Sequence, residues 1–105
     1  DAPVTLSVSG GNLALDFARC PFVGVASAAG NVAFTTPSND SGDTHPHTVL
    51  LTVTGAPRDV TAPGYTPVNF GDADTVTLPA GATGTFVFGR IGATKFCFYG
   101  GRTYP

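Results

Sequence analysis

Residues 84–99 read GTFVFGRIGATKFCFY. Two segments of this stretch, 84–90 and 94–99, alternate aromatic or branched residues with others, as strands with two different faces do. Gly92 lies between them, and glycine readily takes the positive φ that a tight turn requires. The stretch therefore predicts a β-hairpin that turns at Gly92.

The register of this hairpin decides which side chains share a face. A turn centred on the glycine places Phe88 opposite Phe96 and Phe86 opposite Phe98, so that four rings lie on one face and Cys97 on the other. Two interpretations are open. Either the rings pack in the core, or the cysteine face is the core and the rings form an exposed patch, in which Phe96 and Phe98 contact a partner or a neighbouring subunit.

Strands of this kind are expected along the whole chain of 105 residues. Branched and aromatic residues outnumber the long straight-chain residues that favour helices, and Glu, Gln, Met and Trp are absent. The 14 Gly and 9 Pro supply frequent turns. We predict one all-β domain over residues 1–105, a single antiparallel β-sandwich of about seven to nine short strands, with an antiparallel barrel as the alternative. We find no internal repeat.

Two neighbouring segments of the chain contrast sharply. Residues 48–54 are a nearly unbroken run of apolar residues and Thr, and they predict the clearest strand. Residues 55–67 contain three prolines and predict a long ordered loop or an interrupted edge strand. That loop would present Arg58 to solvent.

The two cysteines, Cys20 and Cys97, are too far apart in sequence for a redox motif and too few for a thiolate zinc site. The chain begins at Asp1 and lacks Met, which predicts a processed, secreted or cell-surface protein. In that setting the cysteines form one long-range disulfide, which would stabilise the domain by roughly 4.5 kcal/mol in the chain-entropy model. Two buried free thiols in a cytosolic protein are the alternative.

Residues 78–86, LPAGATGTF, resemble the strand-turn-strand segment common in immunoglobulin-like modules of exported bacterial proteins. The Ala-, Gly-, Thr- and Val-rich composition is also similar to that of small exported actinobacterial β-sandwiches such as the enediyne-carrying apoproteins. The resemblance implies an Ig-like sandwich and an exported location. It brings no functional residue with it.

One segment has the residue types of a metal site. His45 and His47 flank Pro46, so an extended backbone would project both imidazoles to the same side, as two ligands of one transition metal require. Asp43 and Asp40 precede them and could complete the site, with Asp72 and Asp74 as further candidates. The alternative is a solvated polar loop before a strand.

Charge and motifs narrow the function. The net charge of −2 argues against nucleic acid as a binding partner. No apolar run is long enough to span a membrane. No nucleophile elbow or phosphate-binding glycine loop is present, so we expect neither catalysis nor a cofactor. We predict an exported binding, adhesion or assembly module that acts through its surface on a protein or cell-surface partner or on itself. The alternatives are a small protease inhibitor that uses the Arg58 loop and, less favoured, a small exported hydrolase.

Overall fold

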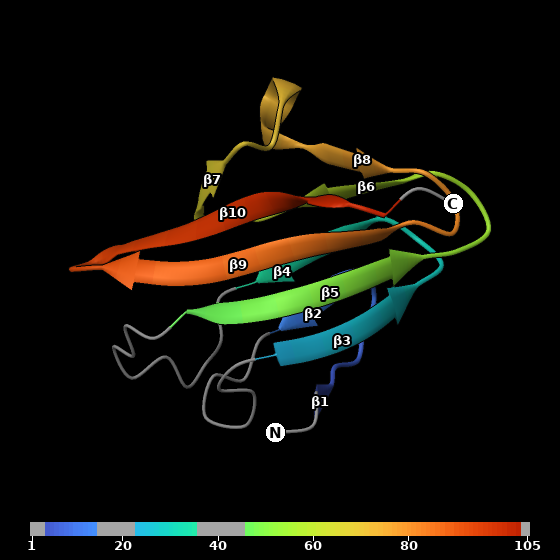
Figure 1. Ribbon diagram of the computed structural model, residues 1–105, viewed down its shortest axis with the longest axis horizontal. Coiled ribbons are helices and arrows are strands. Elements are labelled where there is room, and N and C mark those ends of the chain that lie inside the picture. The colour runs from blue at the N-terminus through green and yellow to red at the C-terminus, as the bar shows by residue number, and fades with distance from the viewer. Residues whose placement is uncertain (1–3, 15–22, 36–45, 104–105) are drawn as a thin grey trace.

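The computed structural model describes residues 4–14, 23–35 and 46–103. The all-β class is confirmed: these residues form ten strands and one short 3₁₀ turn, η1 (Figure 1). The elements are β1 (Val4–Thr5), β2 (Asn12–Ala14), β3 (Val23–Ala28), β4 (Val32–Thr35), β5 (His47–Val53), β6 (Arg58–Thr61), β7 (Thr66–Val68), η1 (Asp72–Asp74), β8 (Val76–Leu78), β9 (Thr83–Ile91) and β10 (Thr94–Arg102).

The strands form two sheets. Sheet A has six strands in the order β1-β3-β5-β9-β10-β7, and sheet B has four in the order β2-β4-β6-β8. From β1 to β9 each successive strand lies in the other sheet, so the chain winds back and forth between the two layers. In Figure 1, β3, β5, β9 and β10 form the broad sheet in front, and β2, β4 and β6 lie behind it.

The prediction of an antiparallel sandwich is wrong for five of the eight strand pairs. Strands β1, β3 and β5 run parallel, as do β2, β4 and β6, and β7 runs parallel to β10. Antiparallel pairing is confined to β5–β9, β9–β10 and β6–β8. From β1 to β6 the winding explains the parallel pairs, because each strand there returns to its own sheet, through one strand of the other sheet, in the same direction. The β6–β8 pair, also joined through one strand of the other sheet, is antiparallel.

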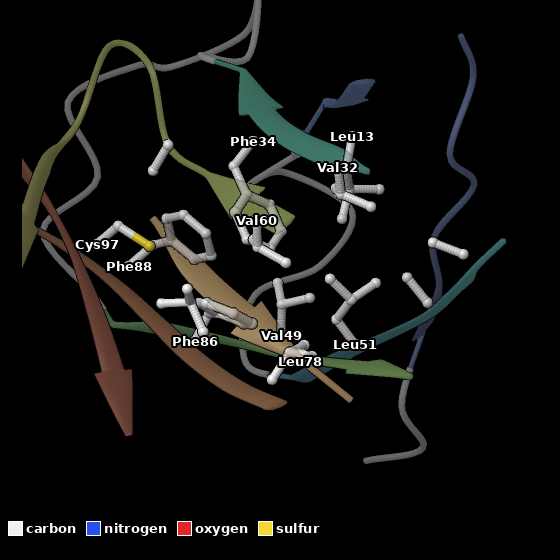
Figure 2. Close-up of a cluster of buried hydrophobic side chains, with 14 of the residues drawn as sticks. Leu13, Val32, Phe34, Val49, Leu51, Val60, Leu78, Phe86, Phe88 and Cys97 are labelled. Carbon is white, nitrogen blue, oxygen red and sulfur yellow. The ribbon is translucent and has the colours of Figure 1, made fainter. Parts of the chain in front are cut away.

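Side chains that point between the sheets form the core. Every second residue of β5, beginning with His47, is buried, as alternation on a strand requires. Phe34 of β4 crosses from sheet B to sheet A, where its ring centroid lies 5.0 Å from those of Phe86 and Phe88. Figure 2 shows these rings gathered with other fully buried side chains, among them Leu13, Val49, Leu51, Val60, Leu78 and Cys97.

The register of the β9–β10 hairpin differs from the predicted one by a single residue. Phe88 pairs with Cys97, and Val87 pairs with Phe98, because the turn consists of Gly92 and the alanine after it rather than being centred on the glycine. A slip of one residue exchanges the two faces of a strand. Phe88 and Cys97 therefore both lie in the core, whereas Phe98 lies on the opposite face.

Replacement of Gly92 by Ala is expected to lower the free energy of unfolding by about 1 kcal/mol. Gly92 has a φ of 61°, and a Cβ built there meets nothing within 4 Å, so the cost arises from the backbone alone. Gly30→Ala is the matched control, because its surroundings are equally open and its φ is not positive. Urea denaturation of both variants measures the difference, and equal losses would contradict the assigned turn.

Candidate functional site

The outward-facing side of sheet A carries no charged side chain in β3, β5, β7, β9 or β10. We call this surface the outer face of sheet A. It is assigned from the alternation of buried and accessible residues along each strand and from the strand register. Its members are Val25, Ser27, Thr48, Leu50, Thr52, Thr66, Val68, Thr83, Thr85, Val87, Gly89, Ile91, Thr94, Phe96 and Phe98.

Two aromatic rings lie together on this face. The centroids of Phe96 and Phe98 are 5.7 Å apart, and their planes differ by 29°, so the rings are stacked along β10. Phe98 pairs with Val87 on one side and with Val68 on the other. At Gly89 a Cβ atom would lie only 4.0 Å from the Phe98 ring, which places that ring beside bare backbone.

Ile91 extends the apolar surface to the end of the hairpin. It is 73% exposed and Phe98 is 39% exposed, and among the described residues these are the two large hydrophobic side chains classed as exposed. Both belong to the outer face of sheet A, and the hairpin turn reaches beyond the neighbouring strands (Figure 1). Large apolar groups concentrated on one face are typical of a contact surface.

Two of the six threonine hydroxyls on the same face are hydrogen-bonded to each other. Thr52 and Thr83 are paired across β5 and β9, and their hydroxyl oxygens are 2.7 Å apart. Because these hydroxyls are hydrogen-bonded within sheet A, they can be buried without a hydrogen bond from a binding partner. That part of the surface therefore behaves as apolar. This arrangement suits burial against a neutral partner, and it provides no titratable group for acid-base chemistry.

The opposite side of the molecule is polar. Asp59 and Thr77 point outward from sheet B, and the Thr77 hydroxyl donates to an Asp59 carboxylate oxygen at 2.8 Å. Asn31 accepts from the Asp59 backbone amide at 3.0 Å. A shallow hollow beside these groups is lined by Asn31, Ala33, Asp59 and Thr61 among others. The outward-facing side of sheet B therefore carries charged and polar side chains, unlike the outer face of sheet A.

The expected Arg58 loop is not present. Residues 58–61 form β6, an internal strand that pairs with both β4 and β8. The Arg58 side chain is half-buried, and its guanidinium donates two hydrogen bonds to the Thr54 carbonyl oxygen, at 3.1 and 3.0 Å. The inhibitor hypothesis required an exposed loop here, and the structure has a sheet strand instead.

Most ligands of the predicted metal site lie outside the described residues. Asp40, Asp43 and His45 are not among them. His47 is the first residue of β5, is 2% exposed and pairs with Phe88, so it points into the core side of sheet A rather than into a polar loop. Within residues 4–14, 23–35 and 46–103 no group of three or more His, Cys, Asp or Glu side chains could hold a metal ion. Asp72 and Asp74 lie exposed in η1.

The predicted disulfide is not confirmed. Cys97 is a free thiol with no exposed surface, and it lies in the core beside Phe88 (Figure 2). Cys20 falls outside the described residues, so the pairing of the two cysteines stays a prediction. Burial raises the pKa of the Cys97 thiol from 9.0 to about 12, because apolar surroundings disfavour the thiolate.

The buried thiol makes stability depend on pH in alkali. In a Cys20→Ala chain, we expect the free energy of unfolding to fall between pH 9 and about 12, because the unfolded thiol loses its proton near 9 and the folded one near 12. Denaturant titrations over this range measure the fall. The same chain with Cys97→Ala retains every other titrating group and should lose less stability. Equal losses in the two chains would contradict the assignment.

Comparisons with protein-family models, curated proteins and solved structures gave no match. In the part of the chain that the structure describes, no helix has the length and apolarity needed to cross a membrane. The outer face of sheet A is therefore identified from its own composition and geometry. Sequence reasoning had selected Phe96 and Phe98 but missed Ile91 and Val87, whose place on the same face follows from the alternation once the correct register is known.

Proposed function

We propose that this protein is a non-catalytic binding, adhesion or assembly module that acts through the outer face of sheet A. The observation that supports this proposal is the stacked pair of Phe96 and Phe98, together with exposed Ile91, on a face without charged side chains. Burying apolar area yields roughly 25 cal/mol per Å². Contact of this face with a neutral or apolar partner surface is therefore favourable in free energy. A charged partner surface would find no group of opposite charge on it.

Export to the cell surface or medium is part of the same proposal. Its support is the resemblance of residues 78–86 to exported Ig-like modules and the Ala-, Gly-, Thr- and Val-rich composition, which is similar to that of small exported β-sandwiches. An exposed contact face suits a protein that meets its partner outside the cell. The Ig-like relationship is proposed only for that short segment, because the parallel strand pairs give this sandwich another topology.

Two matched variants test the proposal. Phe98→Lys places a cation on the outer face of sheet A, and Thr77→Lys places the same charge on the outer face of sheet B, where Asp59 can accept it. Labelled wild-type protein is incubated with extracellular material of its source, and retention is compared with that of both variants. We expect Phe98→Lys alone to lose at least about tenfold in retention. Equal retention of all three proteins would show that this face is not the site.

A further inference from the structure

We infer that the partner of the outer face of sheet A is a second copy of this chain, packed sheet against sheet about a two-fold axis. This inference rests on the proposed function, since both require that face to be a contact surface. A two-fold axis brings the same patch of both copies together, so the patch must be complementary to itself. The outer face of sheet A meets that condition in charge, shape and area.

Charge favours self-pairing on this face in particular. Cationic and anionic patches repel their own copies, whereas the outer face of sheet A has no charged side chain in its five strands from β3 to β7. The described acidic residues Asp59, Asp72 and Asp74 belong to β6 and η1, outside the five strands. Three cations, Arg90, Lys95 and Arg102, do belong to β9 and β10, but Arg90 pairs with Lys95 and Arg102 with buried Gly84, so the register assigns them to the inner side of sheet A. The small net charge of −2 adds little repulsion between whole molecules.

Shape and chemistry agree with packing between two sheets. Apolar sheet faces are normally buried against another sheet about 10 Å away, with interleaved side chains. Phe98 and Ile91 project from the face as the exposed large side chains, while Gly89 leaves the backbone beside the Phe98 ring without a side chain. Projecting side chains beside a residue that has no side chain of its own suit interleaving between two identical faces.

The available area is sufficient for a reversible dimer. The five strands contain 34 residues, which at about 3.4 Å per residue and a strand spacing of about 4.8 Å present a plane of roughly 550 Å² per copy. The two copies together would bury about 1,100 Å², just above the roughly 1,000 Å² expected of a specific interface. Interfaces at this lower limit are typically weak and transient, so we expect a reversible dimer with a dissociation constant roughly in the micromolar range.

Sedimentation velocity of the full chain from about 1 µM to 1 mM tests the inference. We expect the mass to rise with concentration from the 10.6 kDa monomer to twice that value. Phe98→Lys should raise the dissociation constant at least about 100-fold, because it buries an unpaired charge at the centre of the interface. Thr77→Lys adds the same charge on sheet B and should leave the dissociation constant within about threefold of wild type.

A second variant guards against loss of folding. Ile91→Lys alters a side chain that is 73% exposed, so it leaves the core intact, and it should weaken the dimer at least about tenfold. A wild-type chain that remains monomeric at 1 mM would overturn the inference, and so would a dimer that Phe98→Lys and Thr77→Lys affect equally. Neither result decides the proposed function. Sedimentation measures association between copies of this chain, whereas the retention experiment measures its binding to extracellular material.

Discussion

Replacement of Phe86 by Ala is expected to lower the free energy of unfolding by about 3–5 kcal/mol. The Phe86 ring has no exposed surface, and it contacts the rings of Phe34, Phe70 and Tyr99 at centroid separations of 5.0, 5.9 and 5.4 Å. Removing it leaves a cavity between the two sheets and ends those aromatic contacts. For a small domain this loss is a large part of the total stability. Urea denaturation monitored by circular dichroism gives the value.

Phe98→Ala is the matched control, and it also tests the hairpin register. In the register predicted from sequence, Phe86 and Phe98 lie opposite each other on one face, so truncation of either should cost the same. In the structure Phe98 is 39% exposed on the outer face of sheet A, and its truncation should cost no more than about 1 kcal/mol at concentrations where the chain is monomeric. Equal losses would favour the predicted register over the observed one.

Val60→Asp is expected to prevent folding, with a loss of at least about 5 kcal/mol. Val60 has no exposed surface and lies in β6 between Val32 of β4 and Val76 of β8. A carboxylate at this position would be buried without a partner in the centre of sheet B. Circular dichroism and one-dimensional proton NMR of the purified variant show directly whether a folded state remains.

Thr61→Asp is the control for this substitution. Thr61 is the next residue of β6 and points to the opposite, solvent-facing side of sheet B. The same carboxylate there should cost about 1 kcal/mol or less. If Val60→Asp were tolerated as well as Thr61→Asp, residues 55–67 would behave as the exposed loop expected from their prolines, and the assignment of β6 would be wrong.

The proline-rich segment shows why local signals mislead here. Pro57 and Pro63 stand just outside β6, at positions where their missing amide hydrogens cost no sheet hydrogen bond. Between them, Val60 is the one large apolar residue, and a single residue carries no period-two signal. The strand is stabilised by its two neighbours in sheet B rather than by its own composition. The sequence therefore left a loop and an interrupted edge strand open and did not predict an internal strand.

The parallel pairing was also hidden from local reasoning. Gly24 of β3 pairs with Val4 and with Val49, residues that are separated from it by about 20 and 25 positions of chain. A short turn in the sequence predicts that the two strands it joins pair with each other. When the chain passes through the other sheet between two paired strands, no local sequence pattern predicts the pairing. The β9–β10 hairpin was accordingly predicted, and the pairings made through the other sheet were not.

The candidate site depended on one residue of register. Both faces of the hairpin carry apolar side chains, so the sequence left open whether Phe96 and Phe98 were core or surface. The two-residue turn at Gly92 places Cys97 inward and divides the four phenylalanines into a buried pair and a surface pair. Surface exposure of Phe98 and Ile91 then follows from the strand alternation.

By itself the sequence determined that the chain is all-β, that it turns at Gly92, and that a strand covers most of residues 48–54. These properties are local, because side-chain branching, the positive φ of glycine and period-two alternation act within a few residues. Only the tertiary structure decided which strands are neighbours, in which direction they run, and which face of the hairpin is covered. Such choices depend on the summed burial of two whole sheets, in which a shift of one residue exchanges buried and exposed side chains.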